Sequence, residues 1–251
     1  MAFINILGKK VYYQQNGEFL VDRKTVLFIH GAGGTGDIWI HQLSGIKGYN
    51  LIALDLPGHG RSEGFASDNI IAYQEFVWLF IQALQLETLV IAGHSMGGAI
   101  VMDLALSHPE ALDGLIFVNS AARLPVNPKM LESMSRGEHP LAIIKYSYSL
   151  RANPELLERA TAEMKAVPVE VYLADFTACA GFNLVDRVKM IKLPVLILSG
   201  QDDQMTPLKF SEFLSKELPQ SAMVVISDAG HMSMLEQPER VNKAIQSFLD
   251  R

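Results

Sequence analysis

The chain has 251 residues, of which 49% are hydrophobic and 19% charged, so it can bury a large core and is not intrinsically disordered. Its formal net charge of −6 lacks the basic surplus needed to bind a nucleic acid backbone, and no apolar run approaches the ~18 residues that span a bilayer. Cys179 is the only cysteine and no secretion signal is recognised, so we expect a cytoplasmic protein without a nucleic acid partner or a membrane span.

Short apolar runs bounded by Gly, Pro, Asn or Asp alternate with helical periodicity along most of the chain. The runs at 3–6 and 11–14 predict an antiparallel pair of strands at the edge of a sheet. Six further strands are predicted at 25–30, 51–54, 89–93, 115–119, 195–200 and 223–226. Apolar residues at helical spacing predict a helix over 70–84 and another that begins at Pro238. This alternation indicates an α/β fold, with a mainly parallel sheet covered by helices on both faces.

Residues 121–190 break the alternation, because they have helical patterns and aromatic residues but no convincing strand. About 70 residues would make a small core alone, so we interpret them as a helical insertion over the sheet. Residues 1–120 and 191–251 then form one α/β core. The aromatic and methionine residues of the insertion indicate either an apolar substrate pocket or packing of the insertion onto the core. These methionines are Met130, Met134 and Met164.

Ser95 is the first candidate catalytic residue. It lies in Gly93-His94-Ser95-Met96-Gly97, a G-x-S-x-G string that follows a predicted strand and opens a predicted helix. Such a nucleophile elbow needs small flanking residues so that a strained serine can project its hydroxyl. The alternative is a glycine-rich turn with a capping serine. A serine hydroxyl is a poor nucleophile, so a catalytic serine requires a base and an acid that orients the base.

His231 is the candidate base. It lies in the loop after the last predicted strand, and loops after parallel strands leave the same edge of the sheet as Ser95. The alternative is an ordinary loop histidine. We interpret His94 as a packing residue and His30 and His59 as hydrogen-bonded structural residues. No His or Cys cluster with metal-ligand spacing is present, so no metal site is expected.

Two adjacent carboxylates, Asp202 and Asp203, follow the predicted strand at 195–200 and are the candidates for the orienting acid. Both lie at the same predicted sheet edge as the serine and the histidine. Position alone leaves both Asp202 and Asp203 open as the acid.

An oxyanion hole requires backbone N–H groups near the nucleophile. The amide of Met96 is one candidate donor, since it follows the serine at a helix N-terminus. The second is Ala32 in His30-Gly31-Ala32-Gly33-Gly34, where small side chains let the backbone approach a substrate. A flexible glycine turn or a phosphate loop are the alternatives, but the G-x-x-x-x-G-K pattern and its lysine are missing.

These strings resemble the α/β-hydrolase superfamily over nearly the whole chain, and most closely its lidded serine esterase and enol-lactonase type. Further strings with this resemblance are Leu54-Asp55-Leu56-Pro57-Gly58-His59-Gly60-Arg61-Ser62 and Gly230-His231. The resemblance implies the α/β-hydrolase fold with an eight-stranded, mostly parallel sheet, a helical lid after the sixth strand, and no cofactor. It also implies a catalytic triad of Ser95, Asp203 and His231, because the family pattern places the acid four residues before a proline, here Pro207. Asp202 is then expected to point elsewhere and to contribute only to the turn.

The expected function is that of a serine hydrolase that cleaves a small-molecule ester, lactone or similar acyl bond through an acyl-enzyme on Ser95, with His231 as base. A serine nucleophile argues against a haloalkane dehalogenase or an epoxide hydrolase. Two other enzymes with the same triad remain as alternatives, a carbon–carbon bond hydrolase acting on a diketone and a cofactor-free perhydrolase. A non-catalytic ligand-binding receptor on the same fold is an alternative of a different class.

Overall fold

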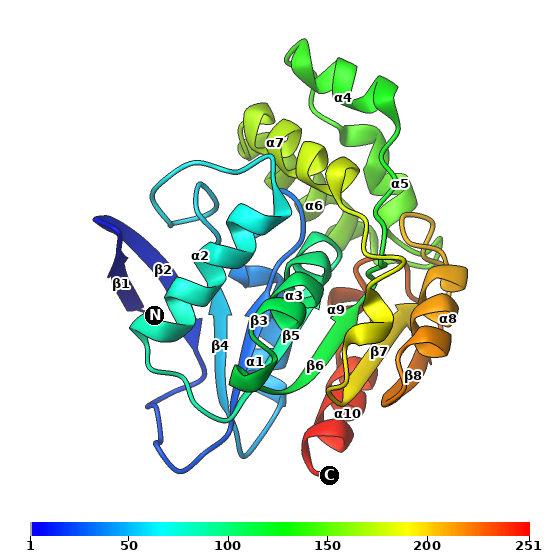
Figure 1. The fold of residues 1–251 in the computed structure, drawn as a ribbon. Helices are drawn as coiled ribbons and strands as arrows, with labels where there is room; N and C mark the ends of the chain where they lie inside the picture. The colour runs from blue at the N-terminus through cyan, green and yellow to red at the C-terminus, as the bar shows by residue number, and fades with distance from the viewer. Residues whose placement is uncertain (1) are drawn as a thin grey trace.

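The computed structural model describes residues 2–251, which form an eight-stranded sheet flanked by helices (Figure 1). The strands are β1 (Ala2–Ile6), β2 (Lys9–Gln15), β3 (Thr25–Ile29), β4 (Asn50–Leu54), β5 (Leu89–His94), β6 (Leu112–Val118), β7 (Val195–Gly200) and β8 (Ser221–Ile226). Their order across the sheet is β1-β2-β4-β3-β5-β6-β7-β8. β2 pairs antiparallel with β1 and β4, whereas β3 to β8 run parallel. The predicted parallel α/β sheet with an antiparallel edge is therefore confirmed.

β6 begins earlier than its sequence pattern indicates. The predicted strand starts at Leu115, because Asp113 and Gly114 interrupt the apolar run, but the observed strand starts at Leu112. Leu112 pairs with Leu89 of β5, and the register then shifts before Gly114 pairs in turn. Backbone pairing across an irregularity extends the strand through residues whose side chains would not indicate one.

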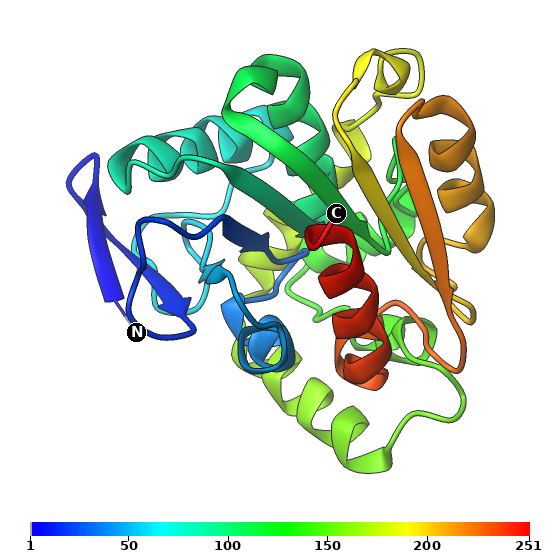
Figure 2. The same cartoon turned by 90° about the horizontal axis from the view of Figure 1, so that it is seen from below.

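The sheet is covered on both faces, and each face has its own hydrophobic core. Figure 2 shows the helices on either side of the sheet. Those on one face are α2 (Ile70–Ala83), α3 (Met96–Ser107) and α8 (Leu208–Glu217), and those on the other are α1 (Ile40–Gly45) and α10 (Pro238–Leu249). Along β3, Leu27 belongs to the first core and Phe28 to the second. This alternation is the period-two pattern of a strand, with both faces buried.

Residues 121–190, called the inserted segment below, lie between β6 and β7 and are mostly helical. Their elements are α4 (Pro128–Ser135), η3 (Leu141–Ile143), α5 (Ile144–Ser147), α6 (Pro154–Ala166), α7 (Val169–Gly181) and η4 (Val188–Met190). α4 and α6 each begin with an Asn-Pro pair, in which the asparagine caps the first turn and the proline occupies its start. Figure 1 shows α4, α6 and α7 gathered beyond one end of the sheet, above α2 and α3.

Three short elements complete the chain, η1 (Gly36–Trp39), η2 (Pro109–Ala111) and α9 (Ser233–Glu236). None of the helices within residues 2–251 has the length and apolar character needed to cross a bilayer.

Candidate active site

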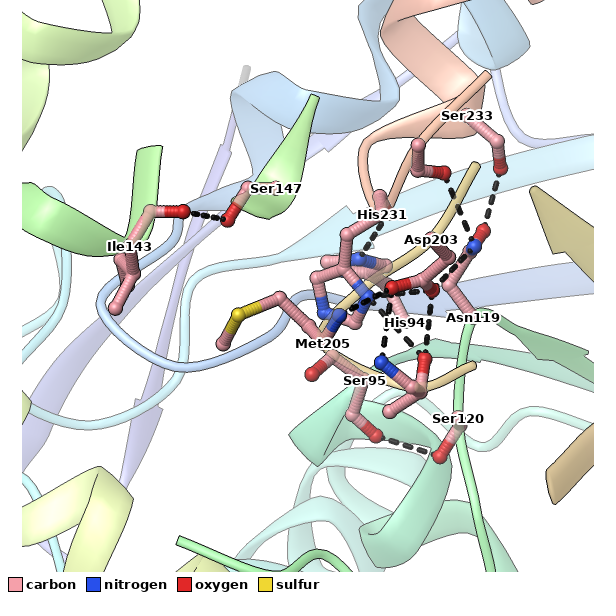
Figure 3. A network of polar contacts seen from close by, with 12 residues as sticks. His94, Ser95, Asn119, Ser120, Ile143, Ser147, Asp203, Met205, His231 and Ser233 are labelled. Atoms are coloured by element: carbon pink, nitrogen blue, oxygen red, sulfur yellow. Dashed lines mark hydrogen bonds and ion pairs between the residues drawn. The ribbon is translucent and has the colours of Figure 1, made fainter. Parts of the chain in front are cut away.

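Ser95 occupies a strained turn between β5 and α3. Its backbone has φ 52° and ψ −115°, a region that residues with a side chain rarely adopt. Its N–H donates to Val118 O at 3.0 Å, and its carbonyl oxygen accepts from Gly98 N at 3.0 Å and from Ser120 Oγ at 2.7 Å (Figure 3). Hydrogen bonds to β6, to α3 and to the residues after β6 therefore hold the strained conformation.

The glycines around Ser95 are a steric requirement. A Cβ atom at Gly93 would lie 2.2 Å from the carbonyl oxygen of Gly97. A Cβ at Gly97 would lie 2.5 Å from the carbonyl oxygen of Ile29 in β3, and both contacts are far too short. The sharp turn expected from the G-x-S-x-G string is present, and its small residues let α3 start directly against the sheet.

His231 and Asp203 form a buried pair. His231 Nδ1 donates to Asp203 Oδ2 at 2.8 Å, and the two residues are only 6% and 5% exposed. His231 follows β8, and Asp203 follows the neighbouring strand β7. Both loops leave the carboxyl ends of parallel strands, as the turn after β5 does. Since Nδ1 holds the proton, Nε2 is the ring nitrogen that can accept one. His231 and Ser95 line the same cavity.

Asp203 accepts four hydrogen bonds besides the one from His231. Its Oδ1 accepts from the backbone amides of Met205 and Thr206, each at 2.8 Å. Its Oδ2 accepts from Thr206 Oγ1 at 2.7 Å and from Asn119 Nδ2 at 2.8 Å. Burial by itself raises the pKa of Asp203, but the charge and hydrogen bond of His231 and the other donors outweigh burial and lower it below its ordinary value. The carboxylate therefore stays ionised beside the imidazole.

Asp202, the other candidate acid, points away from His231. Its Oδ2 accepts a hydrogen bond from Ser149 Oγ at 2.7 Å, in the inserted segment. The structure therefore brings Asp203, and not its neighbour, to the histidine.

Sequence reasoning missed Asn119 as a member of this site. It directly follows β6, is fully buried, and has φ 49°. Its Nδ2 donates to Asp203 Oδ2 and to Gly230 O, and its Oδ1 accepts from Ser233 Oγ at 2.6 Å (Figure 3). The available signal was its position, since a polar residue at the end of a buried parallel strand lies at the edge where sites form.

His94 is buried between the loops of the site. Its Nε2 donates to the backbone oxygen of His231 at 2.9 Å, and the two rings lie 4.7 Å apart between centroids. Burial and the nearby His231 lower the pKa of His94 to about 3, so it remains neutral. The structure confirms it as a packing residue that also supports the backbone of the histidine loop.

The loop of residues 30–34 is ordered by its own histidine. His30 Nε2 accepts from Leu56 N at 3.0 Å, so Nδ1 carries the proton and donates to Gly31 O at 2.8 Å. Gly31 O also accepts from Gly34 N at 3.0 Å, which closes the turn. His30 is a hydrogen-bonded structural residue, as expected, and these contacts give the glycine-rich turn a defined conformation.

The amides of this loop differ in their partners. Gly33 N donates to Asp175 Oδ2 at 2.7 Å, whereas Ala32 N has no acceptor among residues 2–251. Ala32 lines the cavity together with Ser95. Met96 is the first residue of α3, and an amide at that position has no acceptor within its helix. Neither Ala32 N–H nor Met96 N–H therefore has a hydrogen-bond acceptor within residues 2–251.

The cavity beside Ser95 has a volume of about 130 Å³ and a mainly apolar wall. Its apolar residues include Ile143, Ile144, Met164, Phe176, Met205 and Met232. Met164 thus lines the cavity. The pocket interpretation therefore applies to Met164, whereas Met130 and Met134 pack mainly within the inserted segment. Within residues 2–251, no three His, Cys, Asp or Glu side chains are arranged to hold a metal ion.

Comparison with known proteins agrees with this geometry. Residues 26–244 match the alpha/beta hydrolase family, and the chain belongs to it. The chain is 28% identical to (E)-2-((N-methylformamido)methylene)succinate hydrolase of Acinetobacter baylyi, over 97% of this chain and 95% of that protein. The solved structure of a thermophilic esterase is also similar, with 32% identity and a TM-score of 0.85. The match covers 99% of this chain and 96% of the esterase chain.

A second solved structure, that of Est816, described as an N-acyl homoserine lactone degrading enzyme, shares 27% identity with this chain. The match covers 98% of this chain and 100% of that one, with a TM-score of 0.88. The protein is therefore an enzyme, a hydrolase of the α/β-hydrolase family.

Proposed function

We propose that the protein is a serine hydrolase that cleaves a carboxylic ester, a lactone or a similar acyl bond. The observation that carries this proposal is one cavity lined by both the strained Ser95 and by His231, which is hydrogen-bonded to the ionised Asp203. A nucleophile, a base and an acid that orients the base are the three groups that acyl transfer by a serine requires.

In the first step, His231 Nε2 takes the proton of Ser95 Oγ as the oxygen attacks the acyl carbon. The negative charge that develops on the carbonyl oxygen is stabilised by the amides of Ala32 and Met96. The imidazolium, stabilised by Asp203, then protonates the leaving alcohol, which departs and leaves an ester on Ser95. Water repeats the sequence with His231 as base, and this releases the acid and restores the serine.

A compact, apolar acyl group is the substrate part that this cavity favours. The wall is mainly apolar, and a volume of about 130 Å³ is small beside the roughly 300–1,000 Å³ of cavities for drug-sized ligands. We assign the inserted segment the role of a lid, because Ile143, Ile144, Met164 and Phe176 come from it and close one side of the cavity. The names of similar proteins, esterase and lactone-degrading enzyme, agree with oxygen esters as substrates.

Labelling by a fluorophosphonate and turnover of short p-nitrophenyl esters test this proposal. We expect Ser95→Ala to lose labelling and to reduce kcat to the background rate, with an unchanged melting temperature, because the hydroxyl supplies the covalent step. Ser211→Ala is the control, since Ser211 is another buried serine, on α8, whose hydroxyl has no partner among the described residues. It should label and turn over like the wild type.

Either of two results would contradict the proposal. Activity retained by Ser95→Ala would show that another group is the nucleophile. A wild-type protein that binds esters without turnover or labelling would be a receptor and not an enzyme of this class.

A further inference from the structure

A second buried histidine–carboxylate pair lies outside the candidate triad. His59, in the connection from β4 to α2, donates from Nε2 to Asp175 Oδ2 on α7 at 2.8 Å, and their side chains are 1% and 0% exposed. His59 Nδ1 also has an acceptor, Pro57 O at 3.0 Å. Burial lowers the pKa of His59, but the hydrogen bond and charge of Asp175 outweigh burial and raise it. Because each ring nitrogen faces an acceptor, both can donate only in the protonated ring, and this imidazolium is an anchor with no lone pair left to accept a further proton.

The carboxylate of Asp175 joins the inserted segment to three parts of the core. Besides His59, its Oδ2 accepts from Gly33 N at 2.7 Å, in the loop that carries Ala32. Its Oδ1 accepts from the hydroxyl of Tyr73 on α2. A charged acceptor makes a shorter and stronger hydrogen bond to a backbone amide than a neutral one does. The loop of residues 30–34, which carries Ala32, is therefore hydrogen-bonded to a side chain of α7.

Packing supports the same contact. Gly33 has φ +63°, and a Cβ at this position would lie 1.9 Å from a ring carbon of Tyr172. Tyr172 and Asp175 are three residues apart, and so lie on one face of α7. The backbone at Gly33 is thus covered by an aromatic ring and hydrogen-bonded to a carboxylate of the same helix face, which leaves it little freedom to rotate.

We propose that Asp175 is a positioning residue for the oxyanion site, which it orients through the amide of Gly33. Holding that peptide plane fixes the backbone of Ala32 on its C-terminal side, and so the direction in which the Ala32 N–H points into the cavity. Preorganised donors stabilise the transition state without reorganising during the reaction, so a loosened loop lowers kcat. This inference rests on the proposed acyl-transfer function.

The test compares two substitutions of Asp175. Asp175→Leu keeps a similar size but removes the acceptor for Gly33 N. Asp175→Asn keeps an oxygen that can accept this bond, so it is the conservative variant. With a small p-nitrophenyl ester, we expect kcat of the leucine variant to fall about 100-fold with KM changed less than about threefold, on the scale known for loss of one oxyanion donor. The asparagine variant should stay within about tenfold of the wild type.

Two inhibitors distinguish whether Asp175 orients the oxyanion site or only attaches the inserted segment to the core. The oxygen of a catalytic serine adds to the carbonyl carbon of a trifluoromethyl ketone and forms an oxyanion. The secondary alcohol with the same carbon skeleton cannot react in this way. Asp175→Leu should weaken the ketone in proportion to the loss of kcat/KM and leave the affinity of the alcohol unchanged. Tyr73→Phe is the matched control, because it removes a hydrogen bond to the other oxygen of the carboxylate, and it should lower the melting temperature without changing kcat.

A folding defect would not leave the inference untested. Asp175→Leu leaves His59 without its partner, but the double variant His59→Leu/Asp175→Leu replaces a buried pair by two apolar side chains, a change that proteins often tolerate. It should show the same loss of kcat. Wild-type kcat in either folded leucine variant, or equal weakening of both inhibitors, overturns the inference. A wild-type enzyme inert to esters and fluorophosphonate contradicts the proposed function instead, and the inference with it.

Discussion

At the scale of single residues, the second ring nitrogen distinguishes the two buried histidine–carboxylate pairs. In the pair of His231 and Asp203, Nδ1 is bound and the ring lines the cavity, so Nε2 can accept a proton. In the pair of His59 and Asp175, both nitrogens of the histidine have acceptors. Similar burial and similar partners thus yield a candidate base in one case and an anchor between elements in the other.

The two neighbouring acids should differ sharply in their effect on catalysis. Asp203→Asn keeps the size of the side chain but removes its charge and favours the wrong tautomer of His231, so we expect kcat to fall by roughly 10⁴. Asp202→Asn should cost at most a few-fold, because Asp202 binds Ser149. Steady-state kinetics of both variants on one ester measures the difference, and the opposite ranking would assign the catalytic acid to Asp202.

His94 should make folding sensitive to acid. Its pKa is about 3 in the folded protein, against about 6.5 for an unfolded histidine. Between these values only the unfolded chain binds the proton, so the stability from neutral His94 is complete above pH 6.5 and is lost as the pH falls. Between pH 7 and pH 5 the loss is about 2 kcal/mol.

Urea unfolding at the two pH values measures this loss. His94→Gln cannot titrate, and its amide can still donate to His231 O, so the drop in the free energy of unfolding from pH 7 to pH 5 should shrink by about 2 kcal/mol. His41→Gln is the control, since His41 is exposed and its drop should match that of the wild type. Equal drops in all three proteins would mean that His94 titrates alike in both states.

At the scale of elements, the turn from β5 to α3 depends on how closely a helix can approach the sheet. Gly97 lies in the first turn of α3, against the carbonyl oxygens of Ile29, the last residue of β3, and of His30. Any side chain there would push the helix from the sheet, and with it the adjacent Ser95. The position of the candidate nucleophile is therefore a consequence of helix packing.

Gly97→Ala should destabilise the fold by about 3 kcal/mol and displace Ser95, since the added Cβ would lie 2.5 Å from a backbone oxygen. Gly181→Ala is the matched control, because a Cβ at that last residue of α7 meets nothing within 4 Å. Its stability should change by less than about 1 kcal/mol. Thermal and denaturant unfolding of both variants decide the point, and an equally mild effect at Gly97 would show that α3 can shift without cost.

At the scale of the whole molecule, the inserted segment is joined to the candidate active site by polar contacts as well as by apolar packing. Met164 and Phe176 form part of the cavity wall. Asp175 accepts a hydrogen bond from the loop of residues 30–34, through Gly33 N. The inserted segment is therefore part of the candidate active site, although it is one continuous stretch between β6 and β7.

Exchanging residues 121–190 for the matching segment of a related esterase should change the preferred acyl chain, because this segment forms part of the cavity wall. Hydrolysis of a small activated ester should persist when the graft keeps a carboxylate at position 175, and should fall about 100-fold when the graft has leucine there. Ester panels measured on both chimeras test this. Equal activity of the two folded chimeras would contradict the prediction.

The sequence by itself determined the features that depend on near neighbours. Short apolar runs predicted all eight strands, with the main difference at the start of β6, and the glycines around Ser95 predicted the sharp turn. The family match over residues 26–244 bears out the resemblance that the motifs indicated. The limits of the lid at 121–190 and the catalytic roles of the site residues stay predictions.

Tertiary structure alone decided several of the buried polar pairs, although the sequence predicted that of Asp203 with His231. Asn119 and Asp203 are 84 residues apart, and Gly33 and Asp175 are 142 residues apart, yet each pair is joined by one hydrogen bond. An asparagine at a strand end or an aspartate on a helix has no local pattern that names its partner. Burial makes an unpaired polar group costly, so the fold must supply a partner, and only the packing of distant elements determines which one it is.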